Sequence, residues 1–368
     1  MTEYLGFDLH SKDTVYLGQE PSGDVTAQGK VSTTVKGICG LVEALKILQG
    51  TKIGLETGPQ AMWVARLLSG LGMQPVVIDA REVRQKARRI GQKCDRRDAF
   101  EICDGLRRGI YTSIVYVPGP EIQRLRQILS ERRYFVRVCT SQVNRAKSAL
   151  RSVGLGQEAK TLTTLDAWHK LLRRPAVAWV RETLARHRDV WRVAREKVLA
   201  LEGELREALK PFEETVRRLQ TTPGVGMITA ATYLAVIATP QRFADSGRVV
   251  SYIGLVPSTY DTGCVQRHGH ITKRGSCELR AMLCEAAHHA ARPQHPLNPY
   301  WVRVCAKQGY KRAVVAVAQR LGRILYAMWR KEEDFDATKL NVIEKQHTRT
   351  RTYYWQIKKP GQPLVVIG

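Results

Sequence analysis

The stretch Tyr4-Leu-Gly-Phe-Asp-Leu-His10 decides how the N-terminal part of this chain folds. Its large apolar residues, Leu5, Phe7 and Leu9, alternate with smaller or polar ones, and a period of two is typical of a β-strand with one face toward a core. Asp8 therefore belongs to the less apolar face of this strand, where a carboxylate stays available for chemistry.

The pattern that follows predicts a mixed sheet. Residues 20–24, Glu-Pro-Ser-Gly-Asp, have turn composition and separate two further strands of a three-strand meander. Helical periodicity and short apolar runs then alternate, and the last helix carries Asp95 and Asp98. The expected strands are 4–9, 14–17, 25–33, 53–57 and 75–79, with helices at 35–48 and 59–71. This order is typical of a sheet with helices on its faces, and we assign it to a domain of residues 1–115.

Residues 116–219 are expected to form a helical arm. An arginine-rich helical pattern runs from 120 to 154, and a second one, with apolar residues every three or four positions, runs from 175 to 219. Two such helices predict a helical hairpin or coiled coil that serves as a spacer or an oligomerisation arm. Arg124, Arg132 and Arg133 are candidates for nucleic-acid contact, and a solvated charged face is the alternative interpretation.

A third, mainly helical block occupies residues 220–345. Thr222-Pro-Gly-Val-Gly226 offers a capping hydroxyl and a proline, so we expect a helix to begin there and extend to Ile237. The same segment can instead present backbone N–H groups to a phosphate or make a tight turn between helices. Further helices are expected near 246–253, 276–291, 300–308 and 310–331.

A basic loop, residues 254–275, interrupts this block. Cations and histidines gather among its glycines, which allow a backbone to approach phosphates closely. Nucleic-acid binding is the favoured interpretation and a solvated loop is the alternative. A zinc site is disfavoured because the two histidines have no clear third ligand. The candidate residues are Arg267, His268, His270, Lys273 and Arg274.

The charge distribution indicates a polyanionic partner. The formal net charge is +25, yet residues 1–80 carry six Lys and Arg against eight Asp and Glu, so the positive charge belongs to the rest of the chain. Such a field suits nucleic acid, and an anionic membrane surface is the weaker alternative. No apolar run approaches the roughly 20 residues that span a bilayer. The N-terminus also lacks the features of a secretion signal, so we expect an intracellular, cytoplasmic protein.

Four acidic residues stand out against this basic background: Asp8, Glu56, Asp95 and Asp98. Asp95 and Asp98 share one helix face because they are three residues apart, and Asp8 and Glu56 can reach them if their strands are neighbours. Carboxylates packed together repel one another unless divalent cations neutralise them, and oxygen ligands suit Mg²⁺ or Mn²⁺. Two such ions support phosphoryl transfer, which predicts an enzyme that cuts nucleic acid. Surface acids paired with neighbouring cations are the alternative.

Several short motifs, taken together, match a known family. They are Gly6-Phe-Asp-Leu-His10, Leu55-Glu-Thr-Gly58, Lys93-Cys-Asp-Arg-Arg-Asp-Ala99, Thr222-Pro-Gly-Val-Gly226, Arg242-Phe243, Tyr252-Ile-Gly-Leu-Val-Pro257 and Ile271-Thr-Lys-Arg-Gly275. With these motifs the chain resembles the DEDD insertion-sequence transposases, the family of bridge-RNA-guided recombinases related to Piv-type DNA invertases. The resemblance covers both ends of the chain in the order that the family has.

The resemblance implies a fold, partners and a metal. It implies a ribonuclease H-like N-terminal domain similar to Holliday-junction resolvases, a coiled-coil arm and a C-terminal transposase domain. The family's metal ligands fall by position on Asp8, Glu56, Asp95 and Asp98, with Mg²⁺ as the ion. The implied partners are double-stranded target and donor DNA, a noncoding bridge-type RNA and further copies of the chain in a tetramer. The implied location is cytoplasmic and nucleoid-associated.

The resemblance also implies a covalent step. In the family a serine of the C-terminal domain attacks DNA, and counting back from Ile271-Thr-Lys-Arg-Gly275 that position falls here on Thr262. Threonine keeps the hydroxyl but adds a β-branch that crowds the attack. Ser258 is the fallback nucleophile. The rival functions are a structure-selective nuclease whose acids activate water, and a noncatalytic nucleic-acid-binding protein.

Residues 346–368 form a basic-aromatic tail. Tyr353, Tyr354 and Trp355 stand among lysines and arginines, a composition that suits stacking on nucleic acid. A disordered terminus is the alternative interpretation.

Overall fold

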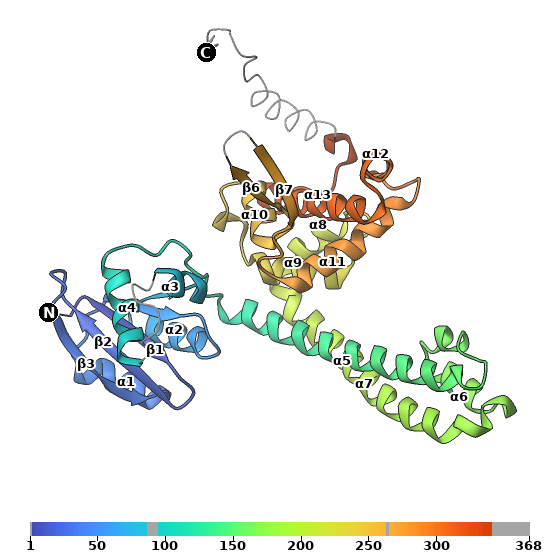
Figure 1. Ribbon diagram of the computed structural model, residues 1–368, viewed down its shortest axis with the longest axis horizontal. Coiled ribbons are helices and arrows are strands. Elements are labelled where there is room, and N and C mark those ends of the chain that lie inside the picture. Colours follow the sequence, from blue (N-terminus) through green and yellow to red (C-terminus); the bar gives the residue numbers. More distant parts are fainter. Residues whose placement is uncertain (1, 87–94, 263–264, 341–368) are drawn as a thin grey trace, which may run out of the picture. The chain divides into compact units, whose positions relative to one another are not determined.

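The computed structural model describes residues 2–86, 95–262 and 265–340, with the backbone alone for 259–262 and 265–268. The chain divides into two compact units, Met1–Gly119 and Pro120–Gly368 (Figure 1). The finer division into four parts stays a prediction. Its basic-aromatic tail, residues 346–368, lies outside the described residues.

The N-terminal unit contains the predicted mixed sheet. Its strands are β1 (Tyr4–Leu9), β2 (Asp13–Gln19), β3 (Val25–Ser32), β4 (Lys52–Glu56) and β5 (Gln74–Ile78). They lie in the order β3-β2-β1-β4-β5. The meander pairs β1 with β2 and β2 with β3 in antiparallel fashion, whereas β4 runs parallel to both β1 and β5. β1 and β4 are therefore neighbours, which is the condition for Asp8 and Glu56 to lie close together.

The two faces of this sheet are covered by different helices. Leu5 and Phe7 are fully buried on one face, in the core that also contains residues of α1 (Val35–Ala44) and α2 (Ala61–Gly70). On the other face, a methyl group added to Gly6 would lie 2.3 Å from the carbonyl oxygen of Ala99 in α4 (Asp95–Arg107). Gly6 is therefore the position where α4 approaches the backbone of β1. A shorter helix, α3 (Ala80–Lys86), follows β5.

The second unit begins with a helical hairpin. The helices α5 (Pro120–Arg151) and α7 (Arg181–Leu209) lie side by side along their length (Figure 1). The helix expected over 175–219 is interrupted, because Pro211 cannot donate a helical hydrogen bond. It consists of η2 (Pro175–Val180), α7, η3 (Lys210–Phe212) and α8 (Glu213–Gln220).

The connection between these two helices has its own small core. It contains η1 (Glu158–Thr161) and α6 (Leu165–Leu172), a helix that the sequence analysis did not predict. Trp168 of α6 is fully buried and its ring lies 6.0 Å from that of Trp191 in α7. Burial of two tryptophans fixes the far end of the hairpin.

The remaining helices form a second core with the near end of the hairpin. They are α9 (Met227–Ile237), α10 (Ser246–Ile253), α11 (Cys277–His288), α12 (Asn298–Gln308) and α13 (Tyr310–Lys331), with short turns η4 (Pro240–Arg242), η5 (His289–Ala291) and η6 (Ala337–Lys339). Those expected near 246, 276, 300 and 310 are confirmed within two residues at their starts. The mainly helical character of this block is therefore confirmed.

One predicted helix start is wrong. Residues 222–226 make a turn and α9 begins at Met227. The N–H of Val225 donates to the carbonyl of Thr222 at 3.0 Å, and Gly224 has a φ of +84°. A side chain on Gly224 would lie 2.9 Å from the carbonyl oxygen of Ala286. The Pro-Gly-Val-Gly segment is thus a tight, packed turn between α8 and α9.

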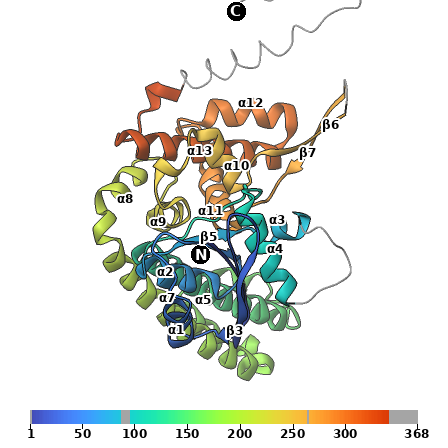
Figure 2. The same ribbon diagram turned by 90° about the vertical axis from the view of Figure 1, so that its left-hand side faces the viewer.

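The basic loop contains an unpredicted β-ribbon. β6 (Pro257–Thr262) and β7 (Val265–Ile271) pair in antiparallel fashion, and Figure 2 shows them extending away from the helices of their own unit. The loop prediction failed because glycines and basic residues masked a run of β-branched and aromatic residues that favour strands. No helix among the described residues combines the length and apolar character needed to cross a membrane.

Candidate active site

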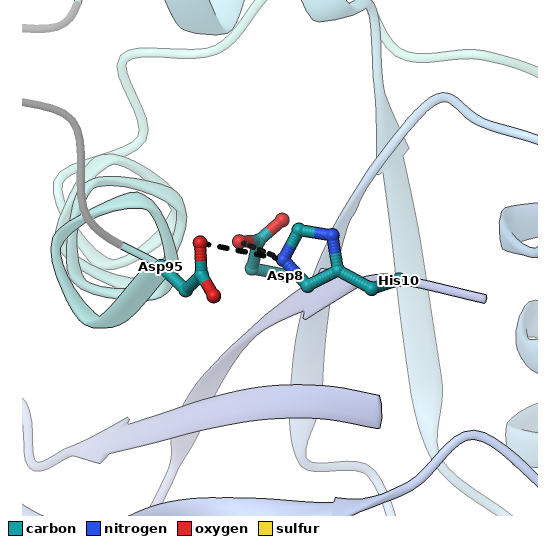
Figure 3. A group of neighbouring side chains, drawn as sticks. All are labelled: Asp8, His10 and Asp95. Atoms are coloured by element: carbon teal, nitrogen blue, oxygen red, sulfur yellow. Dashed lines mark ion pairs between the residues drawn. The ribbon is translucent and has the colours of Figure 1, made fainter. Parts of the chain in front are cut away.

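Three side chains with metal-binding atoms meet beside α4 (Figure 3). Asp8 comes from β1, His10 follows that strand directly, and Asp95 is the first residue of α4. The His10 Nε2 atom lies 3.1 Å from Asp8 Oδ2 and 3.6 Å from Asp95 Oδ1. One ligand atom from each residue falls within 4.8 Å of the other two. Two of the four predicted acidic residues are therefore brought together.

The Asp8 carboxylate has an unfavourable environment as it stands. Its Oδ2 atom is buried, and none of the residues described (2–86, 95–262 and 265–340) donates a hydrogen bond of suitable geometry to it. Burial raises the pKa of this carboxyl above its usual value, His10 opposes that shift, and the charges of Asp98 and Asp95 add to it. A buried acceptor without a donor, next to further negative charge, is what a bound cation would stabilise. The residues present therefore fit a divalent metal.

Asp98 and Glu56 border this group. Asp98 lies in the first turn of α4 and acts on Asp8 through its charge. Glu56 ends β4 and follows Leu55, which pairs with Phe7, so Glu56 continues the sheet face to which Asp8 belongs. Its Oε1 atom lies 4.0 Å from Arg84 Nη2 on α3. The carboxylate of Glu56 thus lies at the same carboxyl end of the strands as Asp8, next to the guanidinium of Arg84.

The sequence analysis missed His10 as a site residue. A signal was present, because residues two apart on an extended segment point to the same face, and His10 is two residues beyond Asp8. The ends of β1 and β4 thus supply the site from one side, and the first turn of α4 supplies it from the other.

The predicted nucleophile lies in the second unit, on the β6–β7 ribbon. Thr262 is the last residue of β6, and its backbone is paired with Val265 where the ribbon turns. Its side chain lies outside the described part of the chain, as do those of Arg267 and His268. The fallback residue, Ser258, donates its hydroxyl to the carbonyl of His270 at 2.9 Å. That bond ties Ser258 to the opposite strand.

Two of the motifs that resemble the transposase family, residues 252–257 and 271–275, form the base of this ribbon. Gly254 and Gly275 both have positive φ, and a Cβ at either one would lie 2.0 Å from a carbonyl oxygen, of Arg274 and Tyr252 respectively. The guanidinium of Arg280 donates to the carbonyls of Arg274, at 2.8 Å, and of Ile253. These glycines are required because two backbones touch here, and their contact fixes where the ribbon leaves the helices.

The basic candidates fall into two groups. His270, Lys273, Arg274 and Arg124 are exposed. Arg132, in contrast, donates to Glu202 of α7 at 2.7 Å, and Arg133 lies 3.8 Å from Glu278 of α11. Arg132 therefore joins the two helices of the hairpin, a structural task that its sequence position did not reveal.

Comparison with known proteins agrees with this arrangement. Residues 5–154 match a family model described as Transposase, of the IS110-type DEDD group, and residues 216–301 match the model described as the Transposase IS116/IS110/IS902 family. The chain belongs to the IS110 family of DEDD transposases. Both the acidic group and the ribbon of this transposase fall inside the matched ranges.

Similar proteins come from several bacteria. The transposase is 27% identical over 290 residues to "Probable family 20 transposase" of Pseudomonas aeruginosa, covering 76% of this chain and 84% of that protein. It is 26% identical to the transposase for insertion sequence element IS1111A of Coxiella burnetii, over 73% of this chain and 75% of the other. It is 27% identical to the transposase for element IS1328 of Yersinia enterocolitica, over 77% and 82%. The present chain is an insertion-sequence transposase.

Proposed function

We propose that this transposase cuts and exchanges DNA strands in a metal-dependent reaction that passes through a covalent protein–DNA intermediate. The observation that carries the proposal is the buried Oδ2 atom of Asp8, which accepts no hydrogen bond from any residue that the structure describes and lies near Asp95, a residue from a distant part of the sequence. Folding such a group without a ligand is costly, so its retention favours a bound cation.

The acidic residues would hold the ion. Asp8 and Asp95 would be direct ligands, with Asp98 and Glu56 completing the negative shell, and Mg²⁺ or Mn²⁺ suits such oxygen donors. A divalent ion, when bound there, would polarise the scissile phosphate. Arg84, next to Glu56, would add a positive charge at the rim of the same site.

Thr262 would supply the nucleophile. Its hydroxyl oxygen would form a bond to the phosphorus of the scissile phosphodiester while the bond from phosphorus to the DNA 3′ oxygen breaks. The proton lost by the threonine would reach the departing oxygen, giving a phosphothreonine and a free 3′ hydroxyl. Attack by the 3′ hydroxyl of a partner strand would reverse these bonds and restore the threonine. The phosphodiester is conserved throughout, so the exchange consumes no nucleotide.

The remaining parts of the proposal follow from the family resemblance. The N-terminal unit would be ribonuclease H-like, and the α5–α7 hairpin would be a coiled-coil arm for assembly. A tetramer would combine the acidic residues of one copy with the ribbon of another. A noncoding bridge-type RNA would select double-stranded target and donor DNA by base pairing, and the protein would recognise backbone shape.

A denaturing gel tests the covalent step. Purified full-length protein, RNA from the noncoding flank and labelled DNA carrying the element ends would be incubated with Mg²⁺ and then denatured. We expect a labelled protein–DNA adduct for the wild type and for Thr262→Ser, and none for Thr262→Ala. RNA binding by each variant serves as the folding control.

Three outcomes would contradict the proposal. Cleaved DNA without an adduct would indicate a nuclease whose acids activate water. An adduct that persists in Thr262→Ala and disappears in Ser258→Ala would move the nucleophile to Ser258. Asp8→Asn, tested in parallel, should abolish both cleavage and adduct, and full activity of this variant would contradict the metal-dependent step.

A further inference from the structure

We infer that His10 is itself a ligand of the metal centre and that its imidazole tunes the centre toward Mn²⁺ and away from Mg²⁺. The inference rests on the proposed metal-dependent function and adds to it a residue that the acidic quartet does not contain. His10 lies where β1 ends, next to the carboxylates of Asp8 and Asp95 (Figure 3).

The spacing of the donor atoms fits coordination. Neighbouring ligands around an octahedral ion, each at roughly 2.0–2.2 Å, are about 3 Å apart. The His10 Nε2 atom lies 3.1 Å from Asp8 Oδ2 and 3.6 Å from Asp95 Oδ1. All three ligand atoms lie within 4.8 Å of one another, so modest side-chain shifts would bring them around one ion.

An ion pair between His10 and Asp8 accounts for the distance of 3.1 Å but does not account for the whole environment of the Asp8 carboxylate. The Asp8 Oδ2 atom lies 3.1 Å from the imidazole, yet within the described part of the chain it accepts no hydrogen bond of acceptable geometry, and it is buried. The His10 side chain is 45% exposed and that of Asp8 is 14% exposed, so the pair still leaves a mostly buried carboxylate. An ion bound to both groups would satisfy the oxygen that the pair leaves unsatisfied.

The donor set predicts the metal. Mg²⁺ prefers oxygen ligands and water, whereas imidazole nitrogen suits the transition metals. Mn²⁺ accepts carboxylate oxygen and also binds more strongly to mixed nitrogen and oxygen sites than Mg²⁺ does. A site with Asp8, Asp95 and His10 should therefore bind Mn²⁺ more tightly than an all-carboxylate site would.

Electron spin-echo envelope modulation of the full-length protein loaded with Mn²⁺ tests the contact directly, because it detects a nitrogen nucleus bonded to the ion. We expect nitrogen modulation in the wild type and its loss in His10→Gln. His169→Gln, which changes an exposed histidine on α6 in the other unit, should keep the signal. Bound Mn²⁺ without nitrogen modulation in the wild type, or modulation that survives in His10→Gln, would overturn the inference.

Metal affinities complete the test. Binding of Mn²⁺ followed by continuous-wave electron resonance should weaken about tenfold or more in His10→Gln, and Mg²⁺ binding should weaken less. Glutamine and asparagine both offer an amide oxygen, so Mg²⁺ binding should fall little in either variant, and His10→Asn should lose the nitrogen signal as His10→Gln does. Equal losses for both ions would refute the tuning. If the wild type bound no Mn²⁺ at all, the proposed metal dependence would fail together with the role of His10. If Mn²⁺ bound without the nitrogen signal, only the role of His10 would fail.

Discussion

The carboxylate of Glu82 on α3 accepts a hydrogen bond from the backbone N–H of Ser113, 2.6 Å away and 31 residues later in the chain. Its other oxygen accepts from the N–H of Thr112, at 3.0 Å, and from the hydroxyl of that residue, at 2.8 Å. Lys86 adds an ion pair at 2.5 Å. Glu82 is buried, and it anchors the helix from which Arg84 reaches Glu56. The position of Arg84 beside Glu56 therefore depends on Glu82.

Glu82→Gln should destabilise the N-terminal unit. Glutamine cannot accept at both ends of its side chain, so a backbone N–H of Thr112 or Ser113 loses its charged acceptor, at a cost of about 1–3 kcal/mol. Unfolding by urea, followed by circular dichroism, measures the change. Glu43→Gln on α1 removes an exposed carboxylate in the same unit and should change stability by less than about 0.5 kcal/mol. Equal stability of the two variants would contradict this role for Glu82.

The stabilities of the wild type and of Glu82→Gln should respond differently to acid. Burial raises the pKa of Glu82, but hydrogen bonds from Lys86, Thr112 and Ser113 outweigh it and lower the pKa from 4.5 to about 2. Because the folded state holds the carboxylate ionised, its stabilisation is complete above pH 4.5 and is lost as the pH falls toward about 2. The advantage of the wild type over Glu82→Gln should therefore shrink across that window. An advantage that is constant with pH would exclude the ionised carboxylate as its source.

Asp8→Asn should have opposite effects with and without metal. Without metal, removing a buried charge beside Asp95 and Asp98 should leave stability unchanged or raise it by up to about 1 kcal/mol. With Mn²⁺ at about 100 times its dissociation constant, the wild type should gain about 2.7 kcal/mol, and the variant should gain none. Melting temperatures, measured with chelator and with Mn²⁺, check both effects.

Asp104→Asn is the matched control for this prediction. The Asp104 side chain is 13% exposed and that of Asp8 is 14% exposed, but Asp104 has cationic partners, Arg107 at 2.6 Å and Arg108 at 3.4 Å. Its loss should lower stability by about 1 kcal/mol without metal and leave the gain from Mn²⁺ intact. If Asp8→Asn behaved in the same way, Asp8 would be a structural residue.

Substitutions of Arg124 and Arg132, both on α5, should have different effects. The first should weaken nucleic-acid binding, and the second should lower the stability of the fold. Arg124 is exposed, so Arg124→Ala should leave stability unchanged and reduce the dependence of binding on salt by about one ion. Arg132 donates through two nitrogens to Glu202, and Arg132→Ala should cost about 1–3 kcal/mol of stability. Filter binding of nucleic acid at several salt concentrations measures the salt dependence, and unfolding by urea measures the stability. A binding loss without destabilisation in Arg132→Ala would restore its predicted role as a nucleic-acid contact.

The parts of the fold that local patterns determine could be predicted from the sequence. The alternation around Asp8 identified β1, and the pattern around Asp95 and Asp98 placed both on one helix, where they occupy the first turn of α4. What failed depended on contacts between distant residues. The partner of Arg132 lies 70 residues later, on a helix whose register the sequence does not show. The β6–β7 ribbon was hidden because composition is a weak guide to strands that pair at a surface.

Gly6 lets α4 lie on β1. A Cβ at this position would stand 2.3 Å from the carbonyl oxygen of Ala99 and 2.6 Å from the backbone nitrogen of Cys103. Backbone atoms of a helix cannot move separately, so Gly6→Ala should push α4 away as a unit, at a cost of about 1–3 kcal/mol. Because Asp95 belongs to that helix, it should move away from Asp8, and Mn²⁺ should bind more weakly even where the variant remains folded.

Gly40→Ala provides the comparison. Gly40 is an exposed residue of α1, and a methyl group there meets no atom within 4 Å, so alanine should stabilise the helix by up to about 1 kcal/mol and leave Mn²⁺ binding unchanged. Circular dichroism confirms folding of each variant, and electron resonance measures the bound ion. Normal Mn²⁺ affinity in a destabilised Gly6→Ala protein would show that the metal centre does not depend on how closely α4 approaches β1.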